Sequence, residues 1–371
     1  MPTSLQRPIA STEFSHALPH WSIGVPFAAI ATLPFVWDRT LGWALIAFVA
    51  LALIAAVLAA VHHAEVVALR VGEPFGTLIL AAAVTVIEVG LIVSVMLAGG
   101  ATASIVARDA VYSAVMIACT GIIGLCLLVG GLRHHELEYR VEGTSPALAV
   151  LAALGTLTLV IPAYTITTPG PSFSTLQLAF AGVMSLALYC VFVFVQTVRH
   201  RDYFLPSDVG NAESHAMPPP LKIALASFGL LAISLVAVVA LAKSLAPSIE
   251  AGVERATLPL AVVGIAISML VLLPETAAAV RAAARNRLQT SLNLGIGSAI
   301  ACIGLSIPTV SLVSIWFGMP LELGLAPKEV VLLALTIVVS VLTLGSGRAT
   351  VMQGAVHLVL FAAFIFLAFF P

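Results

Sequence analysis

The fold of this chain is decided by the stretch LPETAAAVRAAARNRLQTSLNLGIGSAIACIGLSIPTV, which runs from Leu273 to Val310. It contains the end of one apolar segment, a short basic turn and most of a second apolar segment, a pattern that predicts two helices joined in a hairpin. One carboxylate, Glu275, is embedded in the first of these helices. A comparable segment, TVIEVGLI, embeds Glu88 in the first half of the chain. Two helices of this kind, one in each half, predict an internal repeat.

The composition of the whole chain is that of an integral membrane protein. Of its 371 residues, 61% are hydrophobic and 9% are charged, and the mean hydropathy is +1.13. About a quarter of the residues in a soluble domain are charged, so a water-soluble fold could not hide this much apolar surface. The net charge of −1 offers no basic surface, and no nucleic acid is expected among the partners.

Stretches that can span a lipid bilayer recur along the chain. They cover roughly residues 24–37, 41–61, 74–98, 111–131, 147–164, 174–198, 222–242, 256–280, 291–317, 328–345 and 351–370. Backbone groups in lipid must be hydrogen-bonded within the protein, and no alternating pattern of barrel strands is present. We therefore expect an all-α membrane protein of about 11 transmembrane helices, with the lipid bilayer as its surroundings.

The four cysteines do not form a metal-binding pattern. Cys119, Cys126, Cys190 and Cys302 all fall inside apolar segments, without CxxC pairing or ligand spacing. We interpret them as small buried hydrophobic residues. No resident cofactor is predicted.

A polar stretch near the middle divides the chain. It reads RHRDYFLPSDVGNAESHAMPPP from Arg199 to Pro220, a composition typical of a linker. The predicted organisation is an N-terminal tail and extra helix (1–40), a first five-helix repeat (41–198), a cytoplasmic linker (199–221) and a second five-helix repeat (222–371). Because five is an odd number, the second repeat enters the membrane in the opposite sense, which makes the repeat an inverted one.

The distribution of Lys and Arg favours an N-terminus in the cytoplasm. With that orientation eleven basic residues fall on the cytoplasmic side and five on the other side. This agrees with the positive-inside rule. We expect a multi-pass protein of the cell (inner) membrane.

The two embedded glutamates are the predicted centre of the functional site. A charged side chain in the middle of a membrane helix costs about 3 kcal/mol on insertion scales, so an intramembrane carboxylate is a functional candidate by default. The structural alternative is a protonated Glu hydrogen-bonded to a neighbouring helix. Glu88 and Glu275 are the predicted metal ligands. Oxygen-bearing side chains on matching helix faces complete the predicted cation and proton site: Thr77, Ser113, Thr120, Ser268, Asn293 and Ser298.

Two further residues are accessory candidates. Glu73 opens a predicted helix, where a negative charge suits the positive end of the helix dipole, so a structural role competes with a role in gating. His357 lies within the last predicted helix, where a role in packing competes with a role as proton relay. Neither is a predicted catalytic residue.

Four segments carry a family resemblance: VGEPFGTLILAAAVTVIEVGLI, RDAVYSAVMIACTGIIGLCLLVGG, the stretch from Leu273 to Val310, and GRATVMQGAVHLVLFAAF. From about residue 62 to the C-terminus, the chain resembles the ChaA-type calcium/proton and sodium-potassium/proton antiporters of the calcium/cation antiporter superfamily. The resemblance implies ten core helices in two inverted repeats, here with one additional N-terminal helix, and one acidic residue per signature region. Those acidic residues correspond to Glu88 and Glu275. Ala299 or Cys302 stands where relatives often carry Asn or Asp.

The residues and the resemblance together predict a secondary antiporter rather than an enzyme. Ca²⁺, and/or Na⁺ and K⁺, are expected to exchange for protons, because cations and protons compete for the same buried carboxylate oxygens. No GxxxxGK[ST] motif occurs, so ATP is not the evident energy source. A passive cation channel built on the same glutamates is an alternative that the sequence leaves open. An intramembrane enzyme is less favoured, because the sequence has no HExxH or GxSxG motif. The cation, the stoichiometry and the oligomeric state also stay open.

Overall fold

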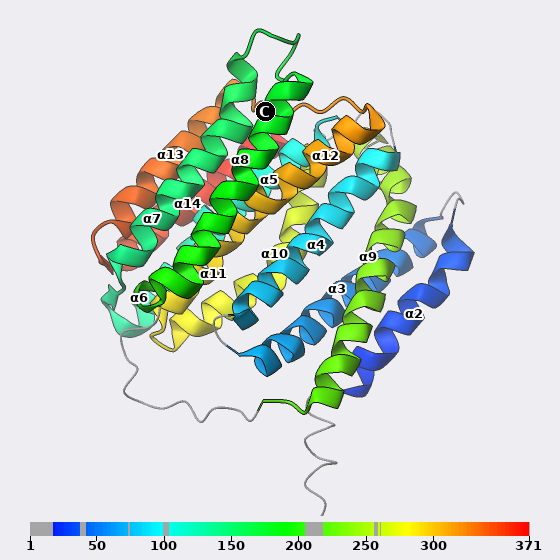
Figure 1. The fold of residues 1–371 in the computed structure, drawn as a ribbon, viewed down its shortest axis with the longest axis horizontal. Helices are drawn as coiled ribbons and strands as arrows, with labels where there is room; N and C mark the ends of the chain where they lie inside the picture. Colours follow the sequence, from blue (N-terminus) through cyan, green and yellow to red (C-terminus); the bar gives the residue numbers. More distant parts are fainter. Residues whose placement is uncertain are drawn as a thin grey trace, which may run out of the picture. The chain divides into compact units, whose positions relative to one another are not determined.

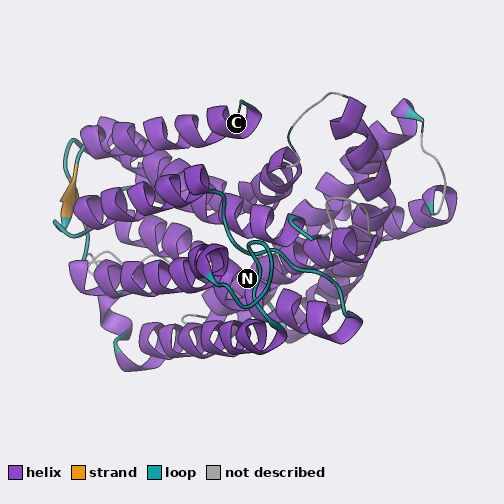
Figure 2. Cartoon of the chain, turned by 90° about the horizontal axis from the view of Figure 1, so that it is seen from above, coloured by secondary structure: helices purple, strands orange, loops and turns teal. Residues whose placement is uncertain are grey.

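The computed structural model describes residues 18–37, 42–72, 75–98, 104–204, 218–255, 259 and 261–370. These residues are almost entirely helical, as Figure 2 shows. The only strands among them, β1 (Leu137–Glu138) and β2 (Arg348–Ala349), pair antiparallel and join two helix ends. The prediction of an all-α fold is confirmed.

The helices follow the predicted apolar stretches in chain order (Figure 1). Their bounds are α2 His20–Val36, α3 Trp43–Val71, α4 Phe75–Ala98, α5 Val106–Met116, α6 Ile123–His134, α7 Val141–Gly155, α8 Thr175–Phe194, α9 Leu221–Arg255, α10 Ala261–Ala284, α11 Leu288–Ala301, α12 Ile307–Phe317, α13 Pro327–Leu344 and α14 Val351–Phe369. Short π-helical turns continue several of them: η1 Ile117–Ile122, η2 Thr156–Val160, η4 Val195–Arg199 and η6 Cys302–Ser306. Two 3₁₀ turns follow, at η3 Ile161–Tyr164 and η5 Arg201–Tyr203.

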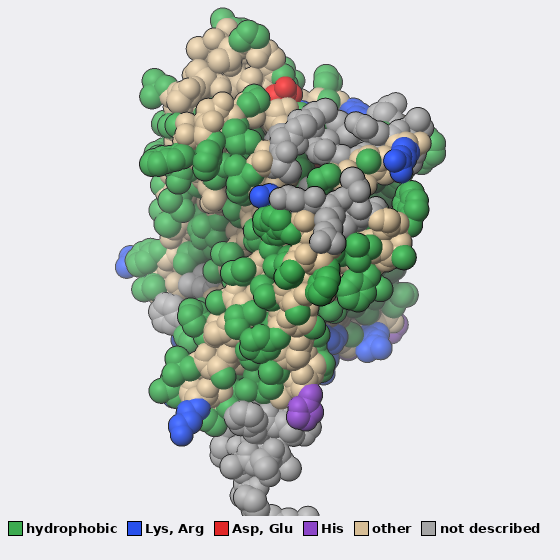
Figure 3. All heavy atoms as spheres, turned by 90° about the vertical axis from the view of Figure 1, so that its right-hand side faces the viewer, with side chains coloured by type: hydrophobic (Ala, Val, Ile, Leu, Met, Phe, Trp, Pro, Cys, Tyr) green, Lys and Arg blue, Asp and Glu red, His purple; other side chains and the backbone are tan. Residues whose placement is uncertain are grey.

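The helices have the length and surface of membrane spans. In the described part of the chain, nine continuous helical segments are long and apolar enough to cross a bilayer, and two shorter apolar helices cover His20–Val36 and Ala82–Leu97. Large apolar side chains also face outward, among them Leu176, Trp316 and Leu342. Figure 3 shows one face of the molecule, on which hydrophobic side chains predominate. Contact between such an apolar surface and lipid is favourable, whereas its exposure to water would be costly.

Two helices extend past their predicted ends. The second predicted helix stops at residue 61, but α3 continues to Val71 through a pair of histidines. His63 is buried, with its Nε2 atom 2.8 Å from the carbonyl oxygen of Ser22, and the ring of His62 packs on that of Trp21. Because α2 supplies these partners, the polar residues do not end the helix. Similarly, α9 continues beyond residue 242 to Arg255.

The prediction that all four cysteines are buried is wrong for one of them. Cys119, Cys126 and Cys302 are buried, but Cys190 is exposed on α8. A small apolar residue on a membrane helix can face lipid as readily as protein, so apolar surroundings in the sequence do not decide its burial.

The chain divides into two compact units. The first comprises residues 1–83 and 213–248, and the second comprises 84–212 and 249–371. A small core of Leu18, Val66, Ile223 and Leu230 holds the first unit together. The division cuts through α4 and α9 and does not follow the predicted repeats. The boundaries 41–198, 199–221 and 222–371 therefore stay predictions.

Within the second unit, glycines let helices pack closely. Helix α10 packs on α5, where a Cβ added to Gly264 would lie 2.8 Å from the carbonyl carbon of Asp109. Helix α14 packs on α6, where a Cβ added to Gly354 would lie 2.6 Å from the backbone nitrogen of Leu128. Small residues are typical of such contacts between membrane helices. The first contact fixes the position of α10, which carries Glu275.

Two long helices of the second unit change their winding halfway. The turn η1 lies between α5 and α6, and the turn η6 lies between α11 and α12. A π-helical turn rotates the residues beyond it relative to those before it and often marks a functional site. In the second case the turn begins at Cys302 and ends at Ser306.

Candidate cation-binding site

Both predicted glutamates are buried in the second unit. Glu88, on α4, exposes 4% of its surface, and Glu275, on α10, exposes 7%. Their carboxylates bond to residues on successive turns of one helix, so the two side chains lie near each other. Buried carboxylates need a proton, a cation or hydrogen-bond donors to balance them. The partners of the two glutamates therefore decide what this place can bind.

One helix supplies a hydrogen-bond donor to each glutamate. Ser298 on α11 donates from its hydroxyl to Oε2 of Glu275 at 2.5 Å. Cys302, the first residue of η6, donates from its thiol to Oε1 of Glu88 at 2.7 Å. Residues four apart on a helix lie on the same face. We call Glu88, Glu275, Ser298 and Cys302 the paired-glutamate cluster.

A further hydroxyl lies one turn beyond the cluster. Ser306, the last residue of η6, is fully buried, and its Oγ atom has no hydrogen-bond partner within the described residues. It lies within interaction range of the Cys302 sulfur. Neither residue was among the predicted site residues. The signal that could have identified them is the spacing of Ser298, Cys302 and Ser306, each four residues from the next.

Two predicted site residues are buried but bond to backbone. The hydroxyl of Thr120 donates to the carbonyl of Met116 in its own helix. The hydroxyl of Ser268 donates to the carbonyl of Ala110 at 2.8 Å and so joins α10 to α5. In both bonds the hydroxyl donates its hydrogen, which leaves the lone pairs of its oxygen free. The role of Thr120 and Ser268 as cation ligands therefore stays a prediction.

The predicted site residue Asn293 points toward a different part of the chain. Its Nδ2 atom donates to the carbonyl of Phe204 at 2.6 Å, and its Oδ1 atom accepts from Gln289 at 3.0 Å. The first bond holds the segment after η5 against α11, and the second stays within α11. The side chain of Thr77 and the whole of Glu73 lie outside the described residues.

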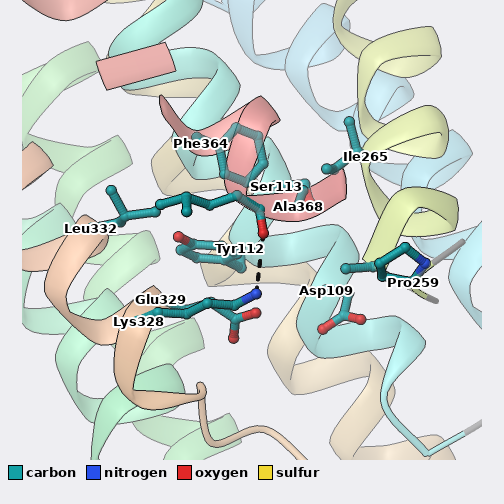
Figure 4. Close-up of a pocket in the computed structure, with 12 residues that line it drawn as sticks. Asp109, Tyr112, Ser113, Pro259, Ile265, Lys328, Glu329, Leu332, Phe364 and Ala368 are labelled. Atoms are coloured by element: carbon teal, nitrogen blue, oxygen red, sulfur yellow. Dashed lines mark hydrogen bonds between the residues drawn. The ribbon is translucent and has the colours of Figure 1, made fainter. Parts of the chain in front are cut away.

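Ser113 lies beside a separate cavity, shown in Figure 4. The cavity has a volume of about 40 Å³ and is lined by residues of α5, α10, α13 and α14, including Asp109, Tyr112 and Glu329. Asp109 is held by Arg108 at 2.8 Å. Lys328 donates to the carbonyl of Leu367 at 3.1 Å, the bond drawn as a dashed line in Figure 4. Ser113 thus lines the same cavity as Asp109 and Glu329, and its role as a cation ligand stays a prediction.

His357 is a fully buried connector between helices. Its Nδ1 atom is 2.8 Å from the carbonyl oxygen of Cys119 in η1, and its Nε2 atom is 3.2 Å from the hydroxyl of Thr343 on α13. A carbonyl can only accept, so Nδ1 carries the hydrogen, and neutral Nε2 accepts from Thr343. This geometry is that of the packing alternative.

Comparison with known proteins shows the family. The sodium/calcium exchanger protein family matches residues 41–198 and 226–370. The chain is 48% identical over 320 residues to y4hA of Sinorhizobium fredii, covering 85% of this chain and 86% of y4hA. It is 34% identical over 312 residues to the sodium-potassium/proton antiporter ChaA of Escherichia coli, covering 83% of this chain and 84% of ChaA. In fold it is similar to the H⁺/Ca²⁺ exchanger CAX, with a TM-score of 0.71 at 14% identity, over 96% of this chain and 89% of that structure.

The family consists of transporters rather than enzymes, and the described helices are those of a multi-pass membrane protein. The resemblance seen in the sequence is confirmed by these matches, which together cover both halves of the chain. The chain therefore belongs to the sodium/calcium exchanger protein family, within the calcium/cation antiporter superfamily.

Proposed function

We propose that this protein exchanges Ca²⁺, and/or Na⁺ and K⁺, for protons across the cell membrane through the paired-glutamate cluster. The observation that carries the proposal is that one helix donates a hydrogen bond to each of two buried glutamates. Two carboxylates in one buried place bring together oxygen ligands and enough negative charge for a cation. The cations are the cargo of the site.

Exchange follows from the need to balance these carboxylates. When a cation leaves, Glu88 and Glu275 are buried charges, and protons are the other species that can neutralise them. When a cation binds, those protons must leave. If the site opens to one side at a time, a proton gradient drives the cation uphill.

Relatives support the coupling to protons. The relative ChaA is named a sodium-potassium/proton antiporter, and CAX is named an H⁺/Ca²⁺ exchanger. The two names share the proton and differ in the cation, which is why the proposal keeps Ca²⁺, Na⁺ and K⁺. The family matches on either side of residues 199–225 also support two repeats. The excess of Lys and Arg on one side supports an N-terminus and a linker in the cytoplasm.

The test is uphill flux in proteoliposomes. The purified protein is given an imposed pH gradient and equal cation concentrations on both sides, with Ca²⁺, Na⁺ and K⁺ supplied separately. An antiporter accumulates at least one cation against its gradient until the pH gradient collapses. A passive channel on the same glutamates would only dissipate gradients, and this result would replace the proposal.

A further inference from the structure

Three polar side chains follow one another along a single helix beside the glutamates. Ser298 bonds to Glu275, Cys302 bonds to Glu88, and Ser306 comes one turn later. The exposed fractions of Cys302 and Ser306 are 2% and 0%. The residue in direct contact with Glu88 therefore presents a sulfur atom to the site, where Ser, Asn or Asp would present an oxygen atom.

The hydroxyl of Ser306 is fully buried beside the Cys302 thiol, and no oxygen or nitrogen atom of the described residues bonds to it. A cation, or a water bound to it, would give this hydroxyl oxygen a stronger partner than the thiol. Ser306 is one helical turn from Cys302 and two turns from Ser298, so it lies nearer to the residue that bonds to Glu88 than to the residue that bonds to Glu275.

We propose that Cys302 sets the ion preference of this site, disfavouring Ca²⁺ relative to Na⁺ and K⁺, with Ser306 as a further ligand. This inference rests on the proposed exchange through Glu88 and Glu275. Ca²⁺ takes six to eight oxygen ligands, and sulfur is a poor substitute for a hard cation.

The charge of the cargo points the same way. Ca²⁺ requires both carboxylates to be ionised and turned toward the ion. A monovalent cation is neutralised by one carboxylate while the other keeps a proton, so it tolerates a weak ligand beside Glu88. A thiophilic divalent cation such as Cd²⁺ has the opposite preference, because sulfur suits it.

The substitution Cys302→Ser tests the inference by exchanging sulfur for oxygen at one position. We expect the ratio of Ca²⁺ exchange to Na⁺ or K⁺ exchange, measured as apparent affinity in proteoliposomes, to rise about fivefold, the ratio that one improved ligand gives. Cys126→Ser, a buried cysteine of α6 that is not in the cluster, is the matched control and should leave the ratio unchanged. An unchanged ratio in Cys302→Ser would overturn the proposal.

Inhibition by Cd²⁺ gives a second readout. Cd²⁺ should inhibit the wild-type protein and Cys126→Ser alike, and inhibition should require at least about five times more Cd²⁺ in Cys302→Ser. If Cys302→Ser does not reach the membrane, Cys302→Ala is measured in the same way. Equal Cd²⁺ sensitivity in all these proteins would overturn the role of Cys302. If the wild-type protein exchanges no cation at all, the proposed function fails. If it exchanges cations and Cys302→Ser changes neither the cation preference nor the sensitivity to Cd²⁺, only the inference about Cys302 fails.

Ser306→Ala tests the further ligand. Removing the hydroxyl should raise the cation concentration for half-maximal exchange several-fold while leaving the maximal rate nearly unchanged. Ser311→Ala, another buried serine without a hydrogen-bond partner but on the next helix, is the control. Equal effects of the two substitutions would show that Ser306 is not a ligand.

Discussion

Cys302 donates a hydrogen bond from its thiol to the carboxylate of Glu88, although 214 residues separate the two in the sequence. One helical turn earlier, Ser298 makes the corresponding bond to Glu275. A single helix is thus coupled to the glutamates of two other helices. A change in the charge of either carboxylate therefore alters a hydrogen bond to the same helix.

Neutralising either glutamate should abolish exchange. Glu88→Gln and Glu275→Gln keep the side-chain size but remove the charge that both cation and proton require. Insertion should not suffer, because an amide is less costly in the membrane than a carboxylate. The measurement is cation-induced pH change in vesicles at matched protein levels, with each of the three cations.

The control for these variants is Glu138→Gln. Glu138 lies on β1, is largely exposed and pairs with Arg348 at 3.3 Å. Exposed ion pairs contribute little, so exchange should stay near the wild-type rate. Near-normal exchange in both Glu88→Gln and Glu275→Gln would place the site elsewhere.

Removing the hydroxyl of Ser298 should weaken cation binding without abolishing it. Ser298→Ala deletes the donor that orients Glu275, and one hydrogen bond of this kind corresponds to about a fivefold loss of apparent affinity. The readout is the cation concentration for half-maximal exchange. Ser291→Ala on the same helix is a matched control, because that buried hydroxyl donates to the carbonyl of Ala279 and not to a glutamate. An equal loss in both variants would indicate general damage to α11.

His357 should matter for stability more than for proton transfer. His357→Ala removes the hydrogen bonds to the Cys119 carbonyl and the Thr343 hydroxyl, each of which contributes about 0.5–1.5 kcal/mol to stability. A lower thermal unfolding midpoint in detergent is the expected result. Exchange per folded molecule should stay close to the wild type. A rate loss of a hundredfold with an unchanged unfolding midpoint would favour the proton relay.

Close packing of α10 on α5 should be sensitive to one added methyl group. Gly264→Ala places a Cβ 2.8 Å from the carbonyl carbon of Asp109, which is backbone and cannot move aside alone. Overpacking of this kind costs about 1–3 kcal/mol. Gly297→Ala is the control, since its added Cβ meets no atom within 4 Å. The comparison uses thermal unfolding, and equal midpoints for both variants would contradict the tight contact.

The membrane orientation can be tested with reporters. With five helices in each repeat, a reporter at Ser207 should be cytoplasmic and one after Phe370 should lie on the opposite side. Alkaline phosphatase and fluorescent fusions distinguish the two compartments. Both reporters on one side would break the arrangement of five plus five helices.

The sequence alone determined the membrane fold and the two carboxylates at its centre. Lipid requires helices whose backbone groups are satisfied internally, so long apolar stretches predict the spans from local sequence. A carboxylate inside such a stretch is costly and therefore conspicuous, which is why Glu88 and Glu275 stand out. Helix ends were less predictable, because partners on other helices, such as Ser22 for His63, keep polar residues within α3.

Only the tertiary structure decided which side chains accompany the glutamates. A Ser or Thr in a helix can bond to backbone as well as to another helix, and Thr120 and Ser268 do so. Ser298 and Cys302 instead reach carboxylates, since the rotation of α11 and the π-helical turn η6 aim them at α10 and α4. Helix rotation is set by packing against neighbours, which residue spacing within one helix does not contain.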